Sequence, residues 1–106
     1  MKRIFQPALL IVAAILLTVV SVGCESTPEE IPEGLSKAEM FQLAQEASDQ
    51  ERWEAAIAYY QEFIDRFPDD QGAIAEARYE IAFLTYKLGD LEGAVALFRD
   101  LLATYE

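Results

Sequence analysis

The sequence of 106 residues contains no histidine and a single cysteine, Cys24. An intramolecular disulfide therefore cannot form, and a Cys/His metal site or a Ser-His-Asp triad has no residues to build it. Any enzyme chemistry would depend on carboxylates alone, and no nucleophile motif accompanies them. We therefore expect no cofactor and no metal, and a cell-wall-acting enzyme is only a remote alternative.

Acidic residues are absent from the first 24 positions, and all 19 of them lie from Glu25 onward. From Cys24 to the end there are 6 basic side chains against 19 acidic ones, a formal charge of −13. Nucleic-acid phosphates are bound by lysine and arginine, so this charge argues against a nucleic-acid partner. It also repels anionic lipid headgroups, so attachment to a membrane must be hydrophobic or covalent.

Residues 1–23 have the parts of a secretory signal: the basic Lys2 and Arg3, a mostly apolar run that is densest at 8–22, and small residues at its end. The dense part covers 15 residues, which is short of the roughly 20 that a stable membrane span needs. We expect an N-terminal signal helix that is removed. The alternative is an uncleaved helix that anchors a single-pass structural protein.

Cys24 lies where the apolar run stops, directly after Ser21-Val22-Gly23. This arrangement resembles the lipobox of bacterial lipoproteins, with Ser21 at a position where leucine is usual. The resemblance implies that residues 1–23 are a lipoprotein signal peptide and that Cys24 carries acyl chains such as palmitate, which anchor the chain to a membrane. It also implies a place in the cell envelope, on the periplasmic side of the outer membrane where the source has two membranes.

The segment after the cysteine is rich in prolines and acids. Residues 25–35 contain two prolines, one glycine and four glutamates. Few apolar side chains are available there to offset the entropy of ordering. We therefore expect residues 24–35, the lipidated cysteine included, to form a disordered acidic linker.

The chain from Ser36 onward is predicted to be helical. Ser36 and Glu39 match a capping box, and apolar residues recur after them at helical spacing. Further helices are expected over about 51–66 and 71–88. A last helix is expected from an N-cap at Asp90 to position 104 or 105.

These helices are two copies of one unit, in which each position of the first copy is matched by the position numbered 38 higher. The matched side chains agree in size and polarity, which is improbable in an arbitrary amphipathic sequence. The matched pairs are Leu43/Ile81, Ala44/Ala82, Trp53/Leu91, Ala56/Ala94, Ile57/Val95, Tyr60/Phe98, Phe63/Leu101, Ile64/Leu102 and Phe67/Tyr105.

The turn at residues 86–95, the paired small residues and Pro68 at the end of the first unit resemble the tetratricopeptide repeat. This resemblance implies an all-α fold, in which residues 36–106 form a short α-solenoid of two helical hairpins after the signal helix. The repeats are expected at about 37–70 and 75–106. The Arg66-Phe67-Pro68 ending is similar to repeats of the outer-membrane assembly lipoprotein BamD and the periplasmic protein CpoB.

Repeats of this family bind peptides or proteins along the concave face that the first helix of each pair forms. The resemblance therefore implies a partner-binding face of Phe41, Gln45, Tyr79, Phe83, Tyr86 and Lys87. Exposed aromatic side chains are good interface anchors, although some of these could instead pack within the hairpin. The last helix carries more apolar surface than one neighbour covers, so we expect self-association, a docked partner or a truncated product; a marginal four-helix monomer is the alternative.

The sequence thus predicts a non-enzymatic, lipid-anchored scaffold or adaptor that mediates protein–protein interaction in the bacterial cell envelope. Participation in outer-membrane protein assembly is one option within this hypothesis.

Overall fold

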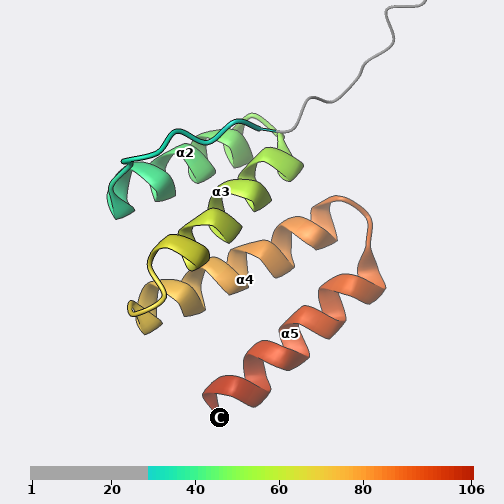
Figure 1. The fold of residues 1–106 in the computed structure, drawn as a ribbon. Coiled ribbons are helices and arrows are strands. Elements are labelled where there is room, and N and C mark those ends of the chain that lie inside the picture. Colours follow the sequence, from blue (N-terminus) through green and yellow to red (C-terminus); the bar gives the residue numbers. More distant parts are fainter. Residues whose placement is uncertain (1–28) are drawn as a thin grey trace, which may run out of the picture.

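The computed structural model describes residues 29–106, which contain four helices and no strand. The helices are α2 (Lys37–Asp49), α3 (Trp53–Arg66), α4 (Gln71–Lys87) and α5 (Leu91–Tyr105). Consecutive helices run antiparallel and form two stacked hairpins, α2–α3 and α4–α5 (Figure 1). The predicted all-α fold is confirmed, with helix limits within about two residues of those expected.

The predicted signal helix and the proposed lipidation site at Cys24 lie outside the described residues. Within the part that is described, no helix is both long and apolar enough to cross a bilayer.

Side-chain caps define the starts of three helices. The predicted capping box is present: the Glu39 backbone N–H donates to Ser36 Oγ at 3.2 Å, and the Ser36 N–H donates to Glu39 Oε2 at 2.7 Å. Asp70 and Asp90 each accept a hydrogen bond from the main chain three residues on, at 3.2 and 2.9 Å. At Gly93 an added Cβ would collide with the Asp90 carboxylate as it is placed here, whereas Asp70 makes the corresponding cap to an alanine.

The internal repeat extends to the backbone of the turns within the two hairpins. Gly89 has φ +91°, and its counterpart Glu51 has φ +59°. Both are in the left-handed region, which favours glycine because it has no Cβ. The four residues by which this repeat exceeds the usual 34 lengthen α4, which begins at Gln71, four positions before the counterpart of Lys37.

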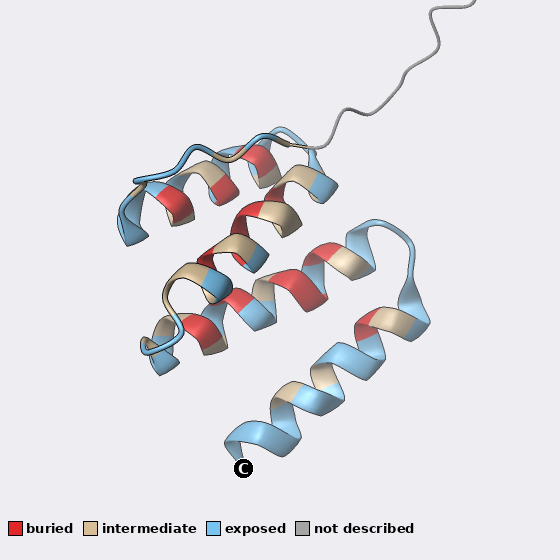
Figure 2. Cartoon of the chain, in the orientation of Figure 1, coloured by how far each residue is buried: buried red, intermediate tan, exposed pale blue. Residues whose placement is uncertain are grey.

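The core lies mainly between α2, α3 and α4 (Figure 2). Its largest fully buried side chains are Phe63, Met40 and Leu84. Alanines on the packed faces have no exposed surface and let neighbouring helices approach closely; they are Ala44, Ala56, Ala77 and Ala82. On α5 only Ala94 is buried, so the burial is concentrated in the first three helices.

Part of the predicted disordered linker is instead ordered, and for residues 29–35 that prediction is wrong. These residues, which we call the N-terminal strap, follow an extended path beside α2, at the end of the stack farthest from α5 (Figure 1). Ile31 and Leu35 pack against the core. The high content of proline and acidic residues had favoured disorder. The residues that Ile31 and Leu35 contact are distant in the sequence, so no local pattern indicated these contacts.

Three side chains of α3 and its N-cap hold the strap by hydrogen bonds. Arg52 Nη2 donates to Glu29 Oε2 at 2.6 Å, and the Tyr59 hydroxyl donates to Glu29 Oε1 at 3.0 Å. Arg66 Nη1 donates to the carbonyl oxygen of Pro32 at 2.8 Å. The three donors recur at every seventh position, so they lie on one face of α3.

Candidate protein-binding surface

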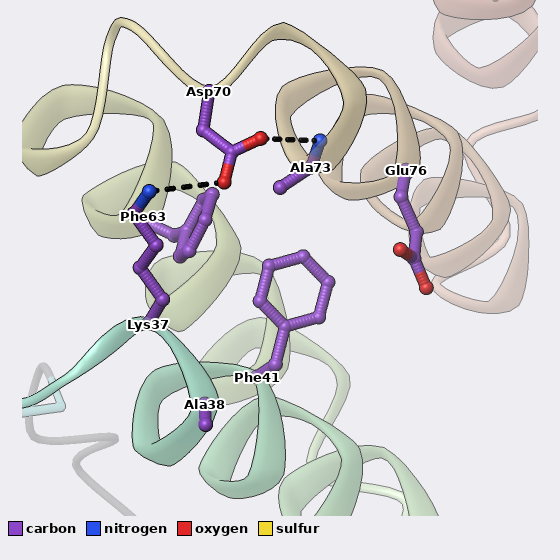
Figure 3. Close-up of a pocket in the computed structure, with 7 residues that line it drawn as sticks. All are labelled: Lys37, Ala38, Phe41, Phe63, Asp70, Ala73 and Glu76. Atoms are coloured by element: carbon purple, nitrogen blue, oxygen red, sulfur yellow. Dashed lines mark hydrogen bonds and ion pairs between the residues drawn. The ribbon is translucent and has the colours of Figure 1, made fainter.

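A groove opens between the first helices of the two hairpins. Its volume is about 210 Å³, and Figure 3 shows Phe41 of α2 facing the start of α4 across it. The lining residues are Lys37, Ala38 and Phe41 of α2, Phe63 of α3, the N-cap Asp70, and Ala73 and Glu76 of α4. We call this the α2–α4 groove.

Aromatic rings form the floor of the groove. The Phe41 ring meets the ring of Phe63 edge-on at 4.6 Å between centroids and that of Tyr60 at 5.4 Å. Such edge-to-face contacts stabilise aromatic pairs beyond the area they bury. Phe41 contacts both rings while remaining partly exposed, so an incoming apolar group could pack on it.

One end of the groove is bridged by an ion pair. Lys37 Nζ lies 3.0 Å from Asp70 Oδ2 (Figure 3). The hydrogen bond from Lys37, followed by the one from the Ala73 N–H, lowers the pKa of Asp70 below its ordinary value. The pair is exposed to solvent, so it adds little stability, and a ligand charge could replace either partner.

Glu76 is the one acidic residue of α4 that lines the groove, and it affects the titration of two neighbouring residues. Burial, and then the neighbouring charge of Glu76, raises the pKa of Glu80. Burial, followed by the charges of Glu80, Glu76 and Asp49, raises the pKa of Tyr60 to about 12. Burial is the larger cause of both shifts, and the charge of Glu76 adds to it, so a basic group of a ligand beside Glu76 would find a negative charge there.

Neither a metal-binding cluster nor an unpaired buried polar side-chain atom occurs among residues 29–106. Residues 29–106 contain no group of three His, Cys, Asp or Glu side chains that could hold a metal ion. No buried side-chain nitrogen or oxygen atom in this range is without a hydrogen-bond partner.

Comparison with known proteins identifies the architecture around this groove. The tetratricopeptide-repeat family matches residues 38–70 and 76–106. The chain belongs to this family. The matched ranges agree within one residue with the predicted repeat limits, and the α2–α4 groove lies between the first helices of the two tetratricopeptide repeats. Repeats of this family generally mediate protein–protein interaction, so the described part of the chain is a protein-interaction module.

A relative is found in Treponema pallidum (strain Nichols), where the similar sequence is named an uncharacterized protein. The two are 34% identical over 86 residues, covering 79% of this chain and 34% of the relative. This chain therefore spans about a third of the length of that relative. No solved structure matches the chain.

The tetratricopeptide fold separates the six predicted partner-binding residues. Phe41 lines the α2–α4 groove, and none of the other five does. Gln45 is exposed on α2. Tyr79 is 51% exposed, and its ring meets Phe98 of α5 edge-on at 5.7 Å, so part of it packs within the second hairpin.

The last three predicted residues come together near the end of α4. Phe83 and Tyr86 are 37% and 51% exposed, with ring centroids 6.4 Å apart. Lys87 Nζ lies 5.4 Å from the Phe83 ring centroid and 5.8 Å from that of Trp53, distances at which a cation is attracted to a ring face. A role for this cluster in partner binding stays a prediction.

Sequence reasoning missed most of the groove lining. Ala38 and Glu76 occupy equivalent positions in the two repeats, and each lies one helical turn before a residue that was predicted, Phe41 or Tyr79. Extending the predicted face by one turn would have found both. Asp70 carried no such signal, because a turn aspartate is expected to cap a helix in any case.

Proposed function

We propose that this chain is a lipid-anchored tetratricopeptide-repeat adaptor of the bacterial cell envelope, which binds a segment of a partner protein in the α2–α4 groove. The observation that carries the proposal is the aromatic floor of this groove beside the carboxylate of Glu76, positioned between two repeats of an interaction family. The preferred ligand is a segment in which an apolar side chain that packs on Phe41 adjoins a lysine or arginine that faces Glu76. Outer-membrane protein assembly is one process such an adaptor could serve.

The anchoring part of the proposal rests on the sequence before the strap. Cys24 follows a signal-like segment and is the one thiol of the chain. Five residue steps separate it from Glu29, where the strap begins, and five extended residues span at most about 18 Å. An acylated Cys24 would therefore hold the repeats close to the membrane surface.

Metabolic labelling with an alkyne analogue of palmitate in a bacterial host tests the anchor. We expect the parental chain and a Ser26→Ala control to incorporate label and to lose the segment 1–23, whereas Cys24→Ser should do neither. Unchanged labelling and processing of Cys24→Ser would exclude lipidation at this residue. A full-length, unlabelled parental chain would instead support the uncleaved membrane anchor.

Site-specific photo-crosslinking in intact envelopes tests the groove. A benzoyl-phenylalanine at position 38 and one at position 76 flank the same opening, so we expect both to form the same covalent adduct. The control position is Ala96, an exposed residue of α5. The adduct from position 38 should be lost in Glu76→Lys, which reverses the charge on the α4 side of the groove. An identical adduct from position 96 would contradict binding in the groove.

A further inference from the structure

The N-terminal strap is bound near both ends of α3. Arg52, at the start of that helix, donates to Glu29, and Arg66, at its end, donates to the carbonyl oxygen of Pro32. Tyr59 between them is only 7% exposed, and its hydroxyl donates to Glu29. The strap is therefore fixed in direction as well as in position: it begins beside the start of α3 and ends where α2 begins (Figure 1).

The three donors that hold the strap are not part of the repeat pattern. Their counterparts 38 positions on are Asp90, Leu97 and Thr104. Neither a carboxylate nor a leucine side chain can donate as an arginine or tyrosine does, and the Thr104 hydroxyl donates to the Asp100 carbonyl oxygen of its own helix at 2.8 Å. The second repeat forms the same helical hairpin without these donors. A repeat does not need them, and in the first repeat all three contact the strap.

The strap changes the point at which the chain from Cys24 joins the repeats. Glu29 lies beside Arg52, at the end of the first hairpin that contains the α2–α3 turn. Without the strap contacts, the first fixed residue would be Ser36, the N-cap of α2. Ser36 precedes Lys37, which lines the α2–α4 groove, and therefore lies at the opposite end of the hairpin. The 14 residues of α3 separate these two ends by about 20 Å.

We propose that the N-terminal strap is an orienting latch: it attaches the repeats to the membrane by the end that carries the α2–α3 turn and holds the α2–α4 groove at the far end. This inference rests on the proposed lipid anchor at Cys24. The five residue steps from Cys24 to Glu29 span at most about 18 Å, whereas the twelve steps to Ser36 in an unlatched chain would span up to about 43 Å. The latch thus shortens the tether and moves its attachment point away from the groove.

The charge of the repeats acts in the same direction as the latch. Residues 29–106 carry 18 acidic and 6 basic side chains, so anionic headgroups repel them and oppose an arrangement in which the hairpins lie flat on the bilayer. A partner segment could then reach the groove without meeting the lipid surface.

Energy transfer to a lipid acceptor tests the latch on the full chain, processed in a bacterial host and reconstituted into vesicles of phosphatidylethanolamine and phosphatidylglycerol that contain a rhodamine lipid. Because Cys24 is acylated, a cysteine introduced by Gln50→Cys or by Gly72→Cys is the free thiol that takes the donor dye. Position 50 is exposed beside the α2–α3 turn; position 72 is exposed at the start of α4, where an added Cβ meets nothing within 4 Å. We expect transfer from position 50 to be at least twofold greater than transfer from position 72.

Opening the latch should remove this difference. Glu29→Ala combined with Ile31→Ser removes the acceptor of two hydrogen bonds and one apolar anchor, and it leaves every residue of the four helices unchanged. The ratio of transfer from the two positions should fall to about one or below, because the attachment point moves to Ser36. The matched control, Glu30→Ala combined with Glu33→Ser, changes two exposed residues of the strap and should keep the parental ratio.

Three adverse outcomes have different meanings. An acylated parental chain with equal transfer from both positions would overturn the latch and leave the lipid anchor unaffected. A Glu29→Ala, Ile31→Ser chain that unfolds at lower urea concentration but keeps the parental ratio would also overturn the latch, since the strap would then only stabilise the fold. A parental chain that takes up no palmitate analogue would overturn the anchor, and this inference with it.

Discussion

The two hairpins of this protein share a sequence pattern and differ in what surrounds them. The α2–α3 hairpin lies between the N-terminal strap and α4, whereas in the α4–α5 hairpin the last helix has a neighbour on one side only, within the described chain. Phe63 of α3 is consequently 1% exposed, while its counterpart Leu101 is half-buried. Similar residues at equivalent positions thus differ in burial. The spacing of apolar residues determines which face of a helix is apolar, whereas the neighbouring helices determine how far that face is buried.

The ends of the stack differ in a second respect. At the strap end, the outward face of α2 is polar, with exposed Glu39 and Glu46, and the strap covers adjacent apolar surface through Ile31 and Leu35. At the α5 end no equivalent cover is present in residues 29–106. One end of the solenoid is therefore closed by its own chain, and the other presents apolar surface.

The largest difference in the free energy of unfolding should come from truncating the equivalent side chains at positions 63 and 101. Phe63→Ala should lower the free energy of unfolding by about 3–5 kcal/mol, because it leaves a cavity among tightly packed rings. Leu101→Ala should lower it by about 1 kcal/mol, since that side chain is only partly removed from water. Urea titration followed by Trp53 fluorescence measures both, and equal losses would contradict the difference in enclosure.

A smaller effect is expected from detaching the strap. Arg66→Met keeps much of the side-chain length but removes the donors to the Pro32 carbonyl and to Glu62, and it should cost about 1–2 kcal/mol. Limited proteolysis within residues 29–35 should become faster. The counterpart substitution Thr104→Met on α5 changes an exposed side chain and should alter stability by less than about 0.5 kcal/mol. An unchanged rate of proteolysis in Arg66→Met would show that the strap does not depend on this residue.

The smallest effect concerns the paired turns. Glu51→Gly should raise the free energy of unfolding by about 0.5–1 kcal/mol, because glycine adopts a positive φ without the steric cost that a Cβ brings. The reciprocal change, Gly89→Glu, should lower stability by a similar amount. Thermal unfolding of the two variants measures these changes in stability. A destabilised Glu51→Gly chain would indicate that contacts of the Glu51 side chain stabilise the fold by more than its positive φ destabilises it.

Most of the fold could be predicted because its signals are local. The Ser36 capping box, the helix end near Gly89 and the N-cap at Asp90 each depend on residues within a few positions of one another. The correspondence between the two repeats then showed that the helices pair into two hairpins. It also indicated that α5 carries surplus apolar surface, which the exposure of Leu91 and Leu102 confirms.

The strap and the groove lining could not be predicted in the same way. Glu29 meets Arg52 and Tyr59, and Lys37 meets Asp70, across 23 to 33 residues of chain. No periodic pattern links residues so far apart. Composition alone therefore predicted that residues 24–35 are disordered and that the turn at Asp69 and Asp70 is solvated. The predicted aromatic face was similarly divided, because Tyr79 packs toward α5 and Phe41 toward α3.

The order of amino acids by itself determined where the helices begin and end, that they recur as two tetratricopeptide units, and which face of each helix is apolar. These features follow from backbone hydrogen bonding and side-chain spacing within a few turns. Only the tertiary structure decided which of those faces are covered, that the strap joins the core, and that Phe41 rather than the α4 aromatics forms the floor of a groove. Those outcomes depend on which surfaces meet in space, because a close-packed side chain is buried only by the particular neighbours that the fold brings against it.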